Sequence, residues 1–336
     1  MPHKPEIATF QSVLAALAAA AEPTRLRLLA LLAEAELTVT ELVAILGQSQ
    51  PRVSRHLKLL VEAGLVERHR EGAWVFFFIS PGCAAAALVR DILARLPAED
   101  EIRASDRVRL AEVRRARAEQ AARYFAAHAA DWDELRALHI PEERVEAAIT
   151  ELVGVAPLYA VLDLGTGTGR MLELLAPRAD RAVGVDQSPQ MLAVARARLE
   201  KAGLRNVQLR QGDIYALPVE RGSYDLVVIH QVLHYLDDPA RAVREAARAL
   251  RPSGRLLIVD FAPHTEESLR EQRAHRRLGF AGEEIASLMQ EAGLDVLTRR
   301  DLVPEKAAGK LTVSLWLGRD RRILSDPLPL TSREFA

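Results

Sequence analysis

The feature that most constrains this chain is an apolar stretch that breaks into three alternating glycines. Residues 161–170 read VLDLGTGTGR, so a run typical of a buried strand is followed at once by Gly165, Gly167 and Gly169. Glycine lets a backbone turn sharply and approach a ligand closely, because it has no side chain in the way. A glycine loop directly after a strand therefore predicts a sheet protein that holds a polar ligand on bare backbone.

Strand and helix patterns alternate on both sides of this loop. Strands are expected at 160–164, 181–186, 207–211, 224–229 and 254–261, and helices at 169–175, 189–202 and 240–250. Such alternation predicts a parallel sheet covered by helices on both faces. Residues 295–302 and 310–319 read as a terminal pair of strands, one of which can run antiparallel.

Acidic residues end the next two expected strands. Asp186 ends the second strand, 23 residues after Asp163, and a carboxylate there can accept hydrogen bonds from both ribose hydroxyls of an adenosyl group. Asp213 follows the third strand, where it can accept from an adenine amino group. The glycine spacing alone is weak evidence, because the third glycine comes one residue earlier than in the dinucleotide fingerprint. Together, the loop and both acids converge on the carboxyl edge of the sheet, where open α/β sheets bind ligands.

These motifs resemble those of the class I S-adenosylmethionine-dependent methyltransferases, over about residues 120–320. The resemblance implies an α/β Rossmann-like, seven-stranded sheet ending in an antiparallel strand, with S-adenosylmethionine or S-adenosylhomocysteine as cofactor. A segment containing Tyr124, Phe125 and Trp132 resembles the helix that covers the cofactor in the small-molecule branch, although aromatic side chains that only pack are the alternative. The expected cofactor-binding residues are Tyr124, Asp163, Gly165, Thr166, Gly167, Gly169, Asp186, Gln187, Met191, Gly212, Asp213, Ile214 and His230.

Binding a cofactor and transferring its methyl group are separate hypotheses. His230 and His234 follow the fourth expected strand and are candidates for a base or an acceptor contact, with ordinary loop residues as the alternative. The segment has no Asn-Pro-Pro-Tyr or Asp-Pro-Pro-Tyr run, which argues against methylation of nucleobase or glutamine amino groups. The single cysteine, Cys83, argues against arsenite methylation by a cysteine relay and against a cysteine-cluster metal site. No metal is expected.

The first hundred residues have a different character. Helices are expected at 10–20, from Pro23, at 38–46, at 51–63 and at 82–96, with strands at 65–68 and 74–79 joined by a connector at 69–72. A Thr-Val-Thr-Glu capping pattern opens the third helix and Gly47 closes it. Two helices separated by a short turn and followed by a hairpin make a winged helix-turn-helix.

The helix expected at 51–63 has one apolar and one cationic face. At about 100° per residue, Val53 and Leu57 fall in one stripe, while the basic side chains fall on the far side. A solvated charged face is the alternative, but the turn before the helix and the wing after it favour DNA binding, in which arginine reads guanine in the major groove. The expected DNA-binding residues are Ser49, Gln50, Arg52, Ser54, Arg55, Lys58, Arg68 and Arg70.

Residues 10–96 resemble the ArsR family of dimeric bacterial repressors, most clearly in the stretch EPTRLRLLALLAEAELTVTELVAILGQSQPRVSRHLKLLVEAGLVERHREGAWVFFFIS. The resemblance implies a homodimer formed by the first helix and the helix after the wing, and a recognition helix at 51–63. Arsenic-sensing members carry a Glu-Leu-Cys-Val-Cys run where this chain has Glu-Leu-Thr-Val-Thr at 36–40. Sensing of soft metals at that position is therefore not expected, because hydroxyls are poor ligands for thiophilic ions.

A chain of 336 residues exceeds what one ordinary core supports, so two domains are expected. The predicted divisions are an ArsR-type winged helix domain at 1–97, a helical linker and cofactor-covering segment at 98–150, a methyltransferase-like domain at 151–320 and a tail at 321–336. The formal net charge of −1 means that DNA binding must depend on a local patch. No window approaches the roughly 20 apolar residues of a membrane span, so no membrane partner is expected and the cytoplasm is the expected location.

Three functions are compatible with these parts. The first is a transcriptional regulator whose binding to double-stranded DNA responds to S-adenosylhomocysteine or S-adenosylmethionine; the resemblance to S-adenosylhomocysteine-responsive repressors of methionine-cycle genes favours it. The second is an active small-molecule methyltransferase with an autoregulatory DNA-binding head. The third is an enzyme that uses the winged helix only to dimerise, and the cationic face of the helix at 51–63 argues against it. The sequence leaves open the effector, the direction of its effect, the operator and any methyl acceptor.

Overall fold

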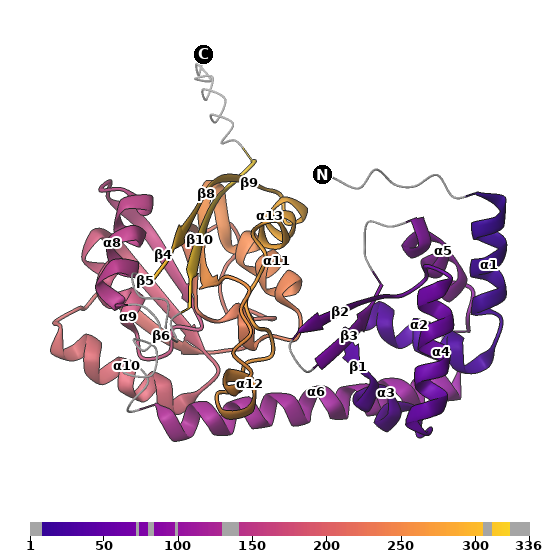
Figure 1. Cartoon of the computed structure of the whole chain (residues 1–336). Coiled ribbons are helices and arrows are strands. Elements are labelled where there is room, and N and C mark those ends of the chain that lie inside the picture. The colour runs from indigo at the N-terminus through magenta and orange to yellow at the C-terminus, as the bar shows by residue number, and fades with distance from the viewer. Residues whose placement is uncertain are drawn as a thin grey trace, which may run out of the picture. The chain divides into compact units, whose positions relative to one another are not determined.

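The structure is a computed structural model in which residues 9–71, 74–79, 84–97, 100–129, 141–304 and 311–322 are described. The chain divides into two compact units, which Figure 1 labels by element. Unit 1 comprises the chain up to Ala121 together with Thr265–Ala274, and unit 2 comprises Ala122–His264 and the chain from His275 onward. Cys83, Trp132 and most of the expected tail lie outside the described residues, as does the side chain of Tyr124.

Unit 1 contains the helices and the wing expected from the sequence. Its elements are α1 (Phe10–Ala20), α2 (Pro23–Glu34), β1 (Leu37–Thr38), α3 (Val39–Leu46), α4 (Gln50–Glu62), β2 (Glu67–Glu71), β3 (Trp74–Phe78) and α5 (Ala84–Leu93). The predicted cap of α3 is confirmed, because Thr38 and Glu41 each accept a hydrogen bond from the other's backbone N–H and form a capping box. Gly47, at φ +64°, ends α3 in the left-handed conformation that glycine favours.

The wing is longer than the sequence indicated. A strand at 65–68 and a connector at 69–72 were expected, but Leu65 and Val66 are buried in the core of unit 1 and β2 begins at Glu67. The expected connector is therefore wrong, because antiparallel pairing with β3 continues as far as Glu71 opposite Trp74. The three-stranded sheet has the order β1-β3-β2.

Two helices lie at or near positions where the chain passes from one unit to the other. The helix α6 (Glu101–His128) is continuous across it, and α12 (Ser268–Gln272) lies in the short segment of unit 1 that the chain enters from unit 2. The pattern of residues did not predict α12. No helix in the described ranges is long and apolar enough to cross a membrane.

Unit 2 is built on a seven-stranded sheet. Its helical elements are α8 (Glu142–Val153), α9 (Arg170–Leu175), η1 (Ala176–Arg178), α10 (Pro189–Lys201), η2 (Leu233–Tyr235), α11 (Pro239–Ala249) and α13 (Gly282–Glu291). Its strands are β4 (Leu158–Leu164), β5 (Ala179–Asp186), β6 (Val207–Gln211), β7 (Tyr224–His230), β8 (Leu250–Phe261), β9 (Leu294–Leu302) and β10 (Val313–Asp320). Helices cover both faces of the sheet (Figure 1), which confirms the α/β class predicted from the sequence.

The strand order explains where a ligand can bind. The order is β6-β5-β4-β7-β8-β10-β9, and the strands from β6 to β8 pair in parallel. The antiparallel strand β10 comes last in the chain but lies between β8 and β9. The chain leaves β4 on one side through β5 and β6 and returns on the other side at β7. This reversal is a topological switch point, beside which open sheets bind ligands at the carboxyl ends of their strands.

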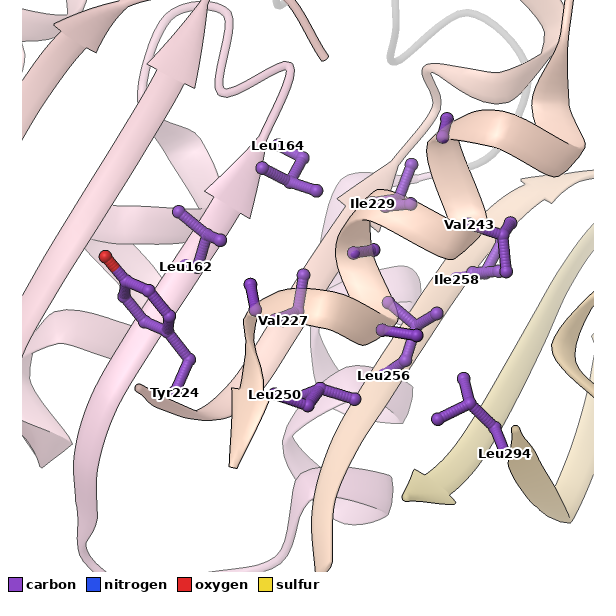
Figure 2. Packing of buried hydrophobic residues seen from close by; sticks show 14 of the residues in the cluster. Leu162, Leu164, Tyr224, Val227, Ile229, Val243, Leu250, Leu256, Ile258 and Leu294 are labelled. Atoms are coloured by element: carbon purple, nitrogen blue, oxygen red, sulfur yellow. The ribbon is translucent and has the colours of Figure 1, made fainter. Parts of the chain in front are cut away.

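The core of unit 2 fixes the positions of these strand ends. Figure 2 shows Leu162 and Leu164 of β4, Val227 and Ile229 of β7 and Val243 of α11 within one buried cluster. Alternate residues of a strand share a face, so Val227 and Ile229 lie on the same face of β7. The two strands that flank the switch point are therefore anchored by apolar packing immediately before the glycine loop begins.

Candidate functional site

The glycine loop adopts a backbone that residues with side chains rarely adopt. Gly165, Gly167 and Gly169 have φ angles of +69°, +52° and +80°. The N–H groups of Gly165 and Thr166 both donate to the carbonyl of Val185, at 2.8 and 3.0 Å, so the loop is tied to the end of β5. Helix α9 begins directly after Gly169. The loop that the sequence singled out is thus a fixed strand-to-helix turn.

Asp163 stabilises the inside of this loop. Its side chain is 1% exposed, and Thr166 Oγ1 donates to its Oδ2 at 2.6 Å. This is the arrangement of an acid that holds a turn together, since a buried carboxylate needs donors to replace water. Asp163 therefore fixes the shape of the loop from inside.

Asp186 lies at the end of β5 and faces two backbone donors. Gly167 N–H donates to its Oδ2 and Ser188 N–H to its Oδ1, each at 2.8 Å. A carboxylate has about four acceptor positions, so these donors do not use all of its acceptor capacity. Asp186 therefore ties the glycine loop to the start of α10 and keeps acceptor capacity at the edge of the sheet.

The remaining expected cofactor residues lie around the ends of β5, β6 and β7. Gln187 is exposed, and Met191, in the first turn of α10, is almost fully buried. Asp213 is exposed and accepts from Tyr215 N–H at 2.9 Å, while the half-buried Ile214 packs against the core. His230 ends β7 and is 7% exposed. The structure brings all of these residues to the carboxyl edge except Tyr124, whose side chain is not among those described.

Three close approaches require glycine at this edge. A Cβ atom on Gly184 would lie 2.6 Å from Leu172 Cδ1, and one on Gly212 would lie 2.8 Å from Pro218. A Cβ atom on Gly165 would lie 2.5 Å from Val232 Cγ2. Gly184 lies inside a strand and was not predicted from the sequence, because only the packed structure shows which atoms occupy the space beside it.

The Gly165 contact gives a stability prediction. Gly165→Ala is expected to lower the free energy of unfolding by about 3 kcal/mol, combining ~1–2 kcal/mol for a left-handed alanine with ~1–3 kcal/mol for overpacking against Val232. Gly203→Ala is the matched control, because Gly203 has φ +70° and nothing within 4 Å of its Cβ position. Urea unfolding followed by circular dichroism should show a smaller loss for the control. Equal losses would contradict the Val232 contact.

A buried imidazole–carboxylate pair lies near the same edge and was not foreseen. His234 Nδ1 is 2.7 Å from Asp260 Oδ1, and their side chains are 1% and 0% exposed. The sequence named His234 as a candidate but gave no indication of Asp260, which lies in β8, 26 residues away. The loop that presents His234 is sharply turned, since Gln231 has φ +54° without being glycine.

Helix α4 presents the cationic surface that the sequence predicted. Val53, Leu57 and Leu60 are buried in unit 1, whereas the expected DNA-binding side chains of this helix and of the turn before it are exposed. The Ser49 hydroxyl makes no capping hydrogen bond. Lys58 Nζ lies 3.8 Å from Glu62 Oε1, one helical turn away. Arg68 and Arg70 are exposed on β2.

Within the described ranges, no three His, Cys, Asp or Glu side chains are grouped to hold a metal ion.

Comparisons with known proteins bear on both units. A family model for the bacterial regulatory proteins of the arsR family matches residues 22–68, and a model for a methyltransferase domain matches residues 162–258. An uncharacterized methyltransferase of Bacillus subtilis, YcgJ, is 36% identical over 106 residues, which are 31% of this chain and 42% of that protein. A demethylmenaquinone methyltransferase of Thermus thermophilus is 41% identical over 105 residues, 31% of this chain and 47% of that protein.

The matched portions are partial. The chain spans about half the length, or less, of the curated relatives it matches. The crystal structure of Bacillus YcgJ superposes with a TM-score of 0.46 at 20% identity, over 54% of this chain and all of that one. The chain thus joins a regulatory helix-turn-helix of the bacterial arsR family, at residues 22–68, to a methyltransferase domain, at residues 162–258.

Proposed function

We propose that this protein is an ArsR-type regulator whose affinity for its DNA operator is set by S-adenosylhomocysteine or S-adenosylmethionine, bound at the carboxyl edge of unit 2. The proposal is supported by the presence of two surfaces in one chain. One is the exposed cationic face of α4, and the other is the sheet edge where Asp186 accepts a hydrogen bond from the glycine loop. The genes it would control are those of the methionine and S-adenosylmethionine cycle.

The residues present fit the proposed ligand. The left-handed glycines leave bare backbone beside α9, Asp186 retains acceptor positions for the ribose hydroxyls, and Asp213 is exposed beside Ile214 for the adenine. When S-adenosylmethionine is bound, its sulfonium supplies a methyl group; the residues of this chain would bind and orient the molecule.

The proposed regulator is a homodimer. Helix α1 leaves an apolar face exposed, with Phe10 at 80%, Leu14 at 51% and Leu17 at 45% exposure. These positions recur at helical spacing, and burying them against the same helix of a second copy would remove a large apolar surface from water. Two copies would present two α4 helices to successive half-sites.

A titration of DNA tests the proposal. A labelled fragment of the protein's own upstream DNA is titrated with protein at fixed salt, because phosphate contacts make affinity steeply salt-dependent. The titration is run with S-adenosylmethionine, with S-adenosylhomocysteine and with neither, and fluorescence anisotropy is recorded. We expect one ligand to change the affinity by about tenfold. Equal affinity in all three conditions would contradict the regulator.

Ligand affinity should also depend on pH. Burial raises the pKa of Asp186, against the opposing effect of the N–H donors of Ser188, Gly167 and Gln187. Ribose hydroxyls donate to the ionised carboxylate, so protonation should weaken binding as the pH falls, by up to about tenfold per pH unit for one proton. Calorimetry with S-adenosylhomocysteine should show this decline starting at a higher pH than the ordinary aspartate pKa of ~3.9 implies. A constant affinity down to that pH would exclude this role of Asp186.

The second candidate is an active small-molecule methyltransferase. The His234–Asp260 pair favours it, because a carboxylate that holds one imidazole nitrogen fixes the ring for proton transfer at the other. A methyl acceptor that is consumed by the wild-type protein but not by His234→Asn, with unchanged cofactor affinity, would support this candidate. In that case DNA binding would serve autoregulation.

A further inference from the structure

The chain crosses between the two units at three places, and in unit 2 the residues that follow two of these crossings contact the same short loop. The crossings are at Ala121–Ala122 inside α6, at His264–Thr265 and at Ala274–His275. Phe125 lies in the part of α6 that belongs to unit 2, just after the first crossing. It packs edge-on against Tyr235, with ring centroids 4.8 Å apart. At the third crossing His275 stacks on His234 at 4.1 Å. Both aromatic contacts are made with residues of η2.

Further contacts bind η2 to the returning chain. The rings of Tyr235 and His275 are 5.0 Å apart, and the N–H groups of Arg276 and Arg277 donate to the carbonyl of His234 at 2.9 and 3.1 Å. Ala274, the last residue before the third crossing, has φ +56°, which costs an alanine free energy. On the unit 2 side of this crossing, residues 275–277 are therefore fixed on η2.

The same loop touches the proposed ligand site. Val232 directly precedes η2, and its side chain occupies the space next to Gly165, where a Cβ atom would come within 2.5 Å. The N–H of Tyr235 donates to the carbonyl of Val232 at 3.0 Å. Any shift of the glycine loop on ligand binding must therefore be accommodated by Val232 and the turn that follows it, because packed side chains leave no free volume.

In unit 1, α6 holds both ends of the first helix of the helix-turn-helix. Arg117 Nε donates to Glu41 Oε1 at 2.8 Å, and Glu41 is also the acid of the box that caps α3. Arg109 Nη1 donates to the carbonyl of Ile45, one residue before the end of α3, at 2.8 Å. The side chains of Arg117 and Glu41 are only 11% and 16% exposed, so this pair is less screened than a surface pair.

We infer that η2 and α6 form the route by which the ligand site controls DNA binding. This inference rests on the proposed function and names its regulation: a ligand-dependent shift at Val232 moves Tyr235, Tyr235 moves the end of α6 through Phe125, and α6 moves α3 through Arg117 and Arg109. Tyr235 and Arg117 are positioning residues at the two ends of this route. Neither belongs to the expected ligand-binding or DNA-binding residues.

The test uses the full-length protein and two pairs of variants. Tyr235→Ala breaks the route in unit 2, with Tyr159→Ala as control, because Tyr159 is 57% exposed near the opposite end of β4. Arg117→Ala breaks it in unit 1, with Arg115→Ala as control, since Arg115 lies on the same helix and is 72% exposed. For each protein, calorimetry gives the affinity for S-adenosylhomocysteine and anisotropy gives the DNA affinity with and without it.

We expect the controls to keep the wild-type ligand effect of about tenfold on DNA affinity. Tyr235→Ala and Arg117→Ala should each bind S-adenosylhomocysteine within about threefold of wild type, with a ligand effect reduced to less than about twofold. If both variants keep the full effect, the route is wrong although the regulator stands. If the wild-type protein shows no ligand effect, the proposed function fails and the route fails with it. If Tyr235→Ala or Arg117→Ala misfolds and loses ligand binding, the ligand effect in the other variant tests the route.

Discussion

Asp186→Ala is expected to lower the affinity for S-adenosylhomocysteine by at least ~100-fold, because hydrogen bonds to a charged group contribute about 1.5–3 kcal/mol each and two ribose hydroxyls would lose theirs. The substitution also removes the acceptor of the Gly167 and Ser188 N–H groups, so the glycine loop itself should loosen. DNA affinity without ligand should remain close to that of the wild type, because Asp186 lies in unit 2 and the recognition helix in unit 1.

Asp180→Ala is the matched control for this variant. Asp180 lies on the same strand, β5, but near its amino end, and is exposed. It should bind S-adenosylhomocysteine as the wild type does, in calorimetry under the same conditions. Retained ligand affinity in Asp186→Ala would remove Asp186 from the site. Loss of DNA binding together with ligand binding would indicate a folding defect, which the thermal melting point of the variant would reveal.

Arg55→Ala should weaken operator binding without changing ligand affinity. Arg55 is exposed on the cationic face of α4, and loss of an arginine that reads a base costs about 1–3 kcal/mol, or roughly 5- to 150-fold. The loss should be concentrated at one base pair of the operator. Anisotropy with a set of single-substitution operators measures both effects.

Two variants serve as comparisons for Arg55→Ala. Lys58→Ala should weaken binding to all of these operators about equally and reduce the dependence of affinity on salt, as expected for a contact to phosphate. Arg115→Ala, also the loss of an exposed arginine but outside α4, should bind DNA as the wild type does. An unchanged affinity for every operator in Arg55→Ala would remove this arginine from the reading face.

Features with a local signature could be read from the sequence. The capping box at Thr38, the terminating Gly47 and the acid at the end of β5 each depend on residues within a few positions of one another, and the structure has them where they were expected. The parallel sheet covered by helices was predictable from the alternation of apolar strands with helices along the chain, and the number of seven strands was implied by the resemblance to methyltransferases.

Features made by distant residues could not be read in this way. His234 lies in η2 and its partner Asp260 lies in β8, 26 residues away. The contacts of Arg117 and Arg109 with α3 join residues 76 and 64 positions apart. The extra length of β2 depends on its pairing with β3. The need for glycine at position 184 depends on Leu172, Leu209 and Thr166. No local pattern encodes these pairings, because tertiary packing selects them.

The most direct test of coupling between ligand binding in unit 2 and DNA binding in unit 1 uses the affinities for S-adenosylhomocysteine and for S-adenosylmethionine. Both are measured with and without saturating operator DNA. Coupling is reciprocal, so a ligand that changes DNA affinity by a given factor must have its own affinity changed by DNA by the same factor. We predict a change of about tenfold for one of the two ligands, equal to the ratio found in the DNA titrations. The same dissociation constant with and without DNA, for both ligands, would contradict the proposed coupling of the two sites.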